Sequence, residues 1–90
     1  MELKWIRKNI DYLDRQIAEK LAQRMDLMTK VAESKASTGT DVSDPGREQE
    51  VLDNVAGVAG VDHEEYVCDI YKAIMEVSKV YQDKLINEGK

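Results

Sequence analysis

The stretch LKWIRKNIDYLDRQIAEKLAQRMDLMTKVAESKA, residues 3–36, determines the fold of this chain. It contains neither proline nor glycine, and its apolar residues recur at steps of three and four from Leu3 through Ile10 to Val31. Residues three and four apart share one face of a helix, so this spacing predicts a single long amphipathic helix. Gly39 is the expected stop, because glycine readily adopts the left-handed conformation that ends many helices.

A second, shorter helix is predicted after this stop. The pair Asp44-Pro45 is typical of a helix start, with the aspartate as N-cap and proline in the first helical position. We expect this helix to cover about 45–56, and we expect Gly57 and Gly60 to end it.

The third predicted helix covers about 63–87. Asp62, in place of the usual serine or threonine, is followed three residues later by Glu65, which resembles a capping box. Its apolar stripe is formed by Val67, Ile70, Ile74, Val77, Tyr81 and Leu85. The sequence therefore predicts an all-α fold of three helices in a single domain, residues 1–90.

The length of the first helix predicts a dimer. About 34 residues at ~1.5 Å each give a helix of roughly 50 Å, whereas a compact chain of this size is only about 30 Å across. An intertwined homodimer is expected, because isologous pairing buries the same apolar face in both chains. The alternative is a helix broken near Gln23-Arg24, although nothing in the local sequence interrupts it there.

Two cations lie on the apolar face of this helix. Arg24 continues the heptad series of apolar residues, and Lys35 follows 11 residues later. The two side chains point within about 20° of each other and are separated by about 16 Å along the axis. Buried cations are costly unless they are paired or bind a ligand. The pair indicates a site for a small dianion; the alternative is that Arg24 pairs with Asp14 or Glu48, or reaches solvent.

Arg7 borders the same face but is too distant to serve the same ligand. It precedes Lys35 by 28 residues, which is about 42 Å along a helix. Within an antiparallel dimer, the beginning of one first helix approaches the partner's pocket. We therefore expect any functional role of Arg7 to be in trans.

Other classes of function fit the sequence poorly. The net charge of −5 argues against nucleic acid as a partner. His63 and Cys68 have no neighbours at metal-ligand or catalytic-dyad spacing, so neither a metal nor a cofactor is expected. No stretch approaches the ~20 apolar residues of a membrane span, and residues 1–8 lack the apolar run of a signal peptide. We expect a cytoplasmic protein.

Five motifs in order resemble the all-α (AroQ-type) chorismate mutases. They are Ile6–Asp11, Leu21–Leu27, Val31–Lys35, Asp44–Glu48 and Ile74–Gln82. Each motif is weak alone, but the ordered set covers about residues 3 to 86. One departure is Gly46, which stands where the family often has an acidic residue.

The resemblance implies a helix-swapped homodimer that converts chorismate to prephenate, in phenylalanine and tyrosine biosynthesis, without metal or cofactor. Each pocket would be completed by Arg7 of the partner, which with Arg24 would hold substrate carboxylate. Lys35 and Gln82 would flank the ether oxygen of the breaking bond, and Glu48 would bind the ring hydroxyl. The remaining positions implied are Asp44, Arg47 and Ser78 for the polar lining, and Val31 and Met75 for the apolar walls.

The sequence leaves three alternatives open for the function and organisation of this chain. An isochorismate-pyruvate lyase shares this fold and has a similar cationic pocket. A non-catalytic helical dimerisation or regulatory module is a second reading, which leaves Arg24 and Lys35 on the apolar face unexplained. The chain is also compatible with a mutase domain of a larger aromatic-pathway enzyme.

Overall fold

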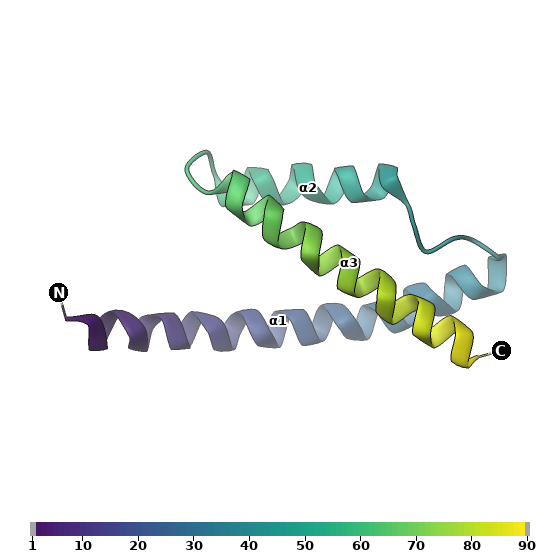
Figure 1. Cartoon of the computed structure of the whole chain (residues 1–90), viewed down its shortest axis with the longest axis horizontal. Coiled ribbons are helices and arrows are strands. Elements are labelled where there is room, and N and C mark those ends of the chain that lie inside the picture. The colour runs from purple at the N-terminus through teal and green to yellow at the C-terminus, as the bar shows by residue number, and fades with distance from the viewer. Residues whose placement is uncertain (1, 90) are drawn as a thin grey trace.

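The computed structural model describes residues 2–89 and contains three helices, α1 (Leu3–Thr38), α2 (Pro45–Ala59) and α3 (Glu64–Glu88). The predicted all-α class is thereby confirmed. Helix α3 is central, since it packs on α2 near its beginning and crosses the second half of α1 (Figure 1). The first half of α1 extends away from the other two helices (Figure 1).

Helix α1 is continuous, so the alternative of a break near Gln23-Arg24 is excluded. It ends at Gly39, which adopts the left-handed conformation with φ of 70° and donates its N–H to the carbonyl of Lys35. This position requires glycine or a residue that tolerates positive φ. The predicted stop is confirmed.

The start of α2 follows its sequence signal, whereas its end does not. Asp44 Oδ1 accepts a hydrogen bond from the backbone N–H of Arg47 at 3.1 Å, and Pro45 occupies the first position. The prediction that Gly57 helps to end this helix is wrong, because α2 continues to Ala59 and ends at Gly60. A single interior glycine costs a helix only about 1 kcal/mol relative to alanine, which the packing of α2 on α3 outweighs.

The predicted capping box at the start of α3 is also wrong. The N-cap is His63, and its side chain makes no capping hydrogen bond. The carbonyl of Gly60 instead accepts hydrogen bonds from the N–H groups of His63, at 3.1 Å, and Glu64, at 2.9 Å. A backbone turn therefore satisfies these donors at the helix start, and Asp62 is not needed as a cap.

The core of a single chain is very small. Among residues 2–89, only four are buried, namely Ala32, Met75, Ser78 and Gln82. The accessible surface is 7148 Å², whereas a compact protein of this mass exposes about 5,300 Å². The radius of gyration is 16.1 Å, against about 12 Å for a compact chain of this length. The isolated fold leaves an unusually large surface uncovered.

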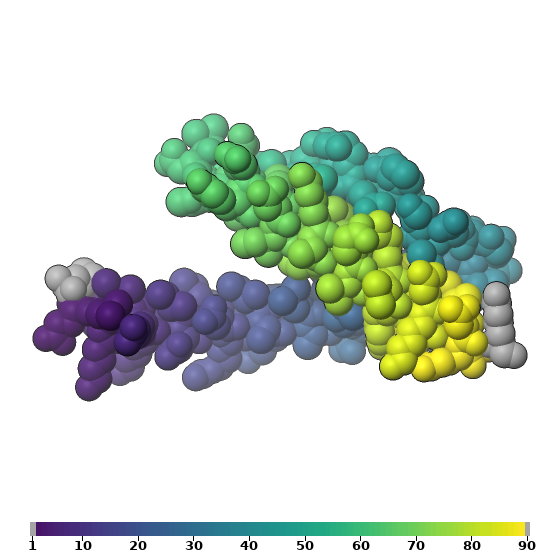
Figure 2. All heavy atoms as spheres, viewed as in Figure 1, coloured from purple at the N-terminus to yellow at the C-terminus, as the bar shows by residue number. Residues whose placement is uncertain are grey.

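The uncovered surface is largely apolar and lies on two helices. Residues 2–20 are all exposed, including the apolar face of α1 around Ile10, and this half projects beyond the rest of the molecule (Figure 2). On α3, Ile70 and Val77 of the predicted apolar stripe are 61% and 60% exposed in the single chain. Across residues 2–89, no helix has both the length and the apolar character of a membrane span.

Candidate active site

A cavity of about 230 Å³ lies between the three helices. It collects nine of the ten residues singled out from the sequence, from all three helices, and Arg7 is the exception. Those nine are Arg24, Val31, Lys35, Asp44, Arg47, Glu48, Met75, Ser78 and Gln82. The fold thus brings residues up to 58 positions apart in sequence, Arg24 and Gln82, to one small volume.

Arg24 is half-buried on α1 and interacts with α3 rather than with an acid. Its Nη1 donates a hydrogen bond to Ser78 Oγ at 2.6 Å, and its guanidinium carbon lies 5.9 Å from the centroid of the Tyr71 ring. Within residues 2–89 it forms no ion pair, so neither Asp14 nor Glu48 neutralises it. A guanidinium held in this way keeps donors for an anionic ligand.

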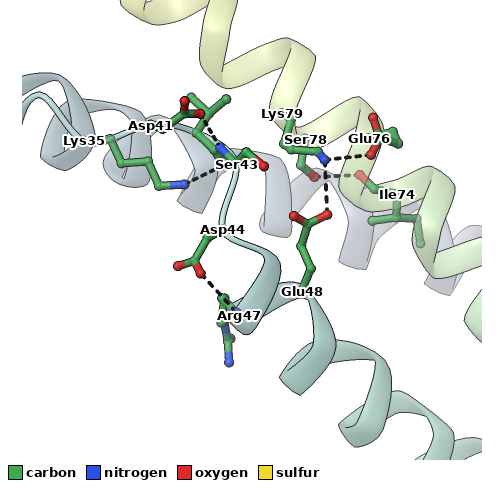
Figure 3. Close-up of polar contacts among 11 residues, drawn as sticks. Lys35, Asp41, Ser43, Asp44, Arg47, Glu48, Ile74, Glu76, Ser78 and Lys79 are labelled. Atoms are coloured by element: carbon green, nitrogen blue, oxygen red, sulfur yellow. Dashed lines mark hydrogen bonds and ion pairs between the residues drawn. The ribbon is translucent and has the colours of Figure 1, made fainter.

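Lys35 is the second half-buried cation of α1, and no carboxylate of the described chain pairs with it. It lies in the last turn of the helix, half-buried, and Nζ donates a hydrogen bond to the carbonyl of Val42 at 2.9 Å (Figure 3). This bond connects α1 to the segment that leads into α2. A lysine ammonium has three donors, so Lys35 can bind an anion without losing this contact.

The first turn of α2 contributes one carboxylate to the cavity and directs one arginine outward. Glu48 is half-buried and lies where the helix dipole favours a negative charge. Arg47 extends away from Lys35 and Glu48 (Figure 3). Its side chain is 62% exposed and lies 3.9 Å from Glu50. Asp44 fixes the start of this turn through its cap, so its role here is to position the backbone of the wall.

Two polar residues of α3 are buried at the cavity. Ser78 accepts from Arg24 and donates to the carbonyl of Ile74 at 2.8 Å. Gln82 donates from Nε2 to the sulfur of Met28 at 3.4 Å, and its buried Oε1 has no hydrogen-bond partner within the described residues. Thioether sulfur is a weak acceptor, and buried polar atoms are normally satisfied. The amide of Gln82 is therefore an unfulfilled hydrogen-bonding group, of the kind found where a ligand binds.

Apolar residues form the remaining walls. Val31 and Met75 are among them, in agreement with the positions taken from the sequence, together with Met28 and Val51. Met75 is buried and the other three are half-buried. Such walls lower the local dielectric and strengthen the interactions of the charged groups with a ligand.

Arg7 lies outside this cavity, exposed on the projecting half of α1. The long helix places it about 42 Å along the axis from Lys35. No other helix of the same chain packs near it (Figure 1). Within one chain Arg7 cannot contact a ligand in the cavity.

Lys79 is a cavity residue that the sequence reasoning missed. Its Nζ lies 3.1 Å from Glu48 Oε1 and 2.7 Å from Glu76 Oε1 (Figure 3). The hydrogen bonds that its ammonium donates to Glu76 and Glu48 raise the pKa of Lys79 above the ordinary value of 10.5. Lys79 precedes Gln82 by three residues and so lies on the same side of α3. This spacing could have identified Lys79 as a cavity residue from the sequence.

The charges of the lining favour an anionic ligand. The lining contains four cations, Arg24, Lys35, Lys79 and the outward-directed Arg47, and two carboxylates, Asp44 and Glu48. In residues 2–89, no three His, Cys, Asp or Glu side chains are grouped so that they could hold a metal ion. Fold and cavity together define an all-α protein whose small interhelical cavity is lined by more cations than carboxylates.

Comparison with known proteins identifies the family. The sequence profile of the family described as chorismate mutase type II matches residues 6–83. A chorismate mutase of Methanocaldococcus jannaschii is 33% identical over 86 residues, which cover 92% of this chain and 86% of that protein. No solved structure matches significantly. The chain belongs to the type II chorismate mutase family.

A second relative is a longer protein. It is the bifunctional chorismate mutase/prephenate dehydratase of Buchnera aphidicola subsp. Schizaphis graminum, 29% identical over 84 residues. The matched region covers 91% of this chain but only 22% of that protein. The chain spans about a fifth of this relative.

Proposed function

We propose that the cavity binds chorismate and that the chain converts it to prephenate. The observation that carries this proposal is the pair Arg24 and Lys35, two half-buried cations of α1 without a carboxylate partner in the described chain. Leaving two such charges uncompensated is unfavourable unless an anion binds them. Chorismate carries two carboxylates, and family membership supports it as the ligand.

Arg24 contributes by restricting the conformation of the substrate. The rearrangement is an intramolecular [3,3] shift, so the enolpyruvyl side chain must lie over the ring before bonds can exchange. Arg24, oriented by Ser78 and Tyr71, holds a carboxylate through charge-assisted hydrogen bonds. Restricting a flexible substrate to its reactive conformer lowers the entropic part of the barrier.

Lys35 and Gln82 contribute by stabilising charge. The ether oxygen gains negative charge as its bond to carbon breaks, and fixed donors stabilise it without reorganising. The ammonium of Lys35 has donors beyond the one it gives to Val42. Gln82 Nε2 gives up only a weak bond to Met28 sulfur when it turns to the ether oxygen.

Glu48 binds the ring hydroxyl as a hydrogen-bond acceptor. Its Oε1 is engaged by Lys79, which leaves Oε2 for the substrate. Asp44, Arg47 and Ser78 complete the polar lining, and Val31 and Met75 exclude water from the ring. The groups required are donors, one acceptor and apolar walls, which is the set that lines the cavity.

The working form is an intertwined homodimer. Each chain exposes about 1,800 Å² more surface than a compact monomer of the same mass. The excess of two chains, about 3,600 Å², lies within the range of surface that obligate dimers bury. Much of it is the apolar face of α1 around Ile10 and Leu13. Pairing these faces by a two-fold axis supplies the core that one chain lacks.

The same assembly places Arg7 of the partner subunit in the active site. A second groove, about 580 Å³, runs between the C-terminal ends of α1 and α3 and is lined by Ala36, Leu85 and Ile86 among others. Lys35 lines both this groove and the catalytic cavity. The beginning of the partner's α1 lies in this groove, and the partner's Arg7 completes the set of groups around the substrate carboxylates.

The decisive experiment is an assay on purified protein with two substrates. Loss of chorismate is followed by absorbance and the product is identified by mass spectrometry. Prephenate as the product supports the proposal, whereas turnover of isochorismate to pyruvate alone supports the lyase. If the protein does not bind a bicyclic dicarboxylate mimic of the transition state, the result supports the alternative of a non-catalytic helical module. The role in aromatic amino-acid biosynthesis follows from membership of the family, whereas the cytoplasmic location stays a prediction.

A further inference from the structure

One ion pair connects two helices in the described part of the chain. Of the five pairs among residues 2–89, four join residues of one helix, and only Lys79–Glu48 joins α3 to α2. Both of its side chains are largely covered, Lys79 at 22% and Glu48 at 27% exposed, whereas Glu76 is 68% exposed. This contact is better shielded from solvent than the other pairs, and shielding strengthens it.

The geometry determines which carboxylate oxygen is available to a ligand. Lys79 Nζ is held between Glu76 Oε1 at 2.7 Å and Glu48 Oε1 at 3.1 Å (Figure 3). Glu76 lies one turn before Lys79 on α3 and fixes the ammonium from the solvent side. The ammonium in turn holds one oxygen of Glu48, which restricts the rotation of the carboxylate and leaves Oε2 to accept another hydrogen bond.

We propose that Lys79 is a positioning residue for this reaction: it orients Glu48 through Oε1, so that Oε2 accepts the hydroxyl of the substrate ring. The inference rests on the proposed function, because it concerns the group that Glu48 binds. Lys79 does not touch the substrate in this role. Its contribution passes entirely through Glu48 and depends on the hydroxyl being present.

Lys79 also compensates the negative charge of Glu48 before a ligand binds. Without Lys79, Glu48 faces a dianionic ligand as an uncompensated carboxylate, which repels both substrate carboxylates. With Lys79, the carboxylate of Glu48 is compensated, and Arg24 and Lys35 stay available for the two charges of the ligand. Lys79 thus allows an acid, needed for the hydroxyl, to reside in a site for a dianion.

The test separates orientation from overall charge. Two bicyclic dicarboxylate mimics of the transition state are compared by isothermal titration calorimetry, one with the ring hydroxyl and one without it. Loss of a hydrogen bond to a charged group should cost about 10-fold in affinity. We expect Lys79→Met to reduce the preference of the wild type for the hydroxylated mimic by about this factor, and Lys79→Arg to restore most of it.

Lys72→Met is the matched control. Lys72 lies on the same helix and pairs with Asp69 at the same i, i+3 spacing as Lys79 and Glu76, but it is 62% exposed and outside the cavity. We expect this variant to bind both mimics as the wild type does. Circular dichroism establishes that each variant is folded, and Lys79→Gln replaces Lys79→Met if the latter loses its helical signal.

The outcomes distinguish this inference from the proposed function. If Lys79→Met lowers the affinity for both mimics by the same factor, or changes neither affinity, the preference for the hydroxylated mimic is unchanged. This result would overturn the positioning role while leaving the mutase assignment intact. Binding of neither mimic by the wild-type protein would overturn the proposed function and the positioning role with it. In Glu48→Gln, where the carboxylate is absent, Lys79→Met should not reduce the hydroxyl preference further; a further reduction would also overturn the inference.

Discussion

Replacing Lys35 with alanine removes the cation at one end of the cavity. Its Nζ donates to the carbonyl of Val42 at 2.9 Å, in the segment between α1 and α2. Arg24, the other half-buried cation of α1, lies about 16 Å away along the helix axis, so it cannot replace the ammonium of Lys35. The substitution therefore tests both the charge at the ether oxygen and the small contribution of this hydrogen bond to the fold.

The two effects differ in size. A preorganised donor at a developing oxyanion is worth about 3–4 kcal/mol, or ~10²–10³ in kcat. The lost hydrogen bond to Val42 costs only about 1 kcal/mol of stability. Lys35→Ala should therefore nearly abolish turnover while the helices and the dimer persist.

The assay follows chorismate by its absorbance, with circular dichroism for the fold and analytical ultracentrifugation for the assembly. Lys30→Ala is the control, since Lys30 is an exposed lysine of the same helix outside the cavity. We expect the control to retain wild-type turnover. Near-normal activity of Lys35→Ala would refute the role given to this residue.

The same variant tests the shared site. When Lys35→Ala is mixed with Arg7→Ala and subunits exchange at random, half of the dimers are mixed, and one of the two sites in each is intact. About a quarter of the wild-type site activity should return, because a two-fold dimer pairs the intact Lys35 of one chain with the intact Arg7 of the other. No recovery in verified heterodimers would refute the contribution of Arg7 in trans.

Three further predictions follow from the fold. Gly57→Ala should stabilise the protein by about 1 kcal/mol, since a methyl group there meets no atom within 4 Å. Gly39→Ala should destabilise it by about 1–2 kcal/mol, because φ is +70° at this position. Urea unfolding that gives both changes in stability the same sign would contradict this. Ile10→Asp should weaken dimerisation by at least about 3 kcal/mol, since two copies of a side chain worth about 1.5–3 kcal/mol leave the interface, and ultracentrifugation showing an unchanged dimer would count against the proposed assembly. The hydrogen bonds that Lys79 donates to Glu76 and Glu48 raise its pKa above 10.5, so its ion pairs stabilise the fold fully below pH 10.5 and lose this effect as pH rises through the raised pKa. The difference in Tm between wild type and Lys79→Met should shrink over that range, and a constant difference would contradict the linkage.

Much of the candidate site was predictable because helix periodicity is local. Arg24 and Lys35 lie on one face of α1 however the helices pack, since 11 residues complete about three helical turns. The motif resemblance then supplied Glu48, Ser78 and Gln82. All five residues line one cavity in the structure, although their roles in the reaction stay predictions.

The errors in the sequence reasoning arose where a local signal competed with its surroundings. Gly57 is a helix breaker by propensity, yet α2 continues past it, because packing against α3 outweighs a cost of about 1 kcal/mol. Asp62 resembles a cap, yet the carbonyl of Gly60 already satisfies the donors of the turn. A different limit concerns Ile70 and Val77, which belong to the predicted apolar stripe but are exposed in one chain, because periodicity identifies an apolar face without saying which surface covers it.

The sequence by itself determined three helices, the excess length of the first, and two cations on its apolar face. Only the tertiary structure decided that Arg24 bonds to Ser78 rather than to an acid, and that Lys79 reaches across to Glu48. The reason is that the first set depends on contacts within a few residues, which helix geometry dictates. The second set joins positions 54 and 31 residues apart, and which side chains meet there depends on how the helices cross.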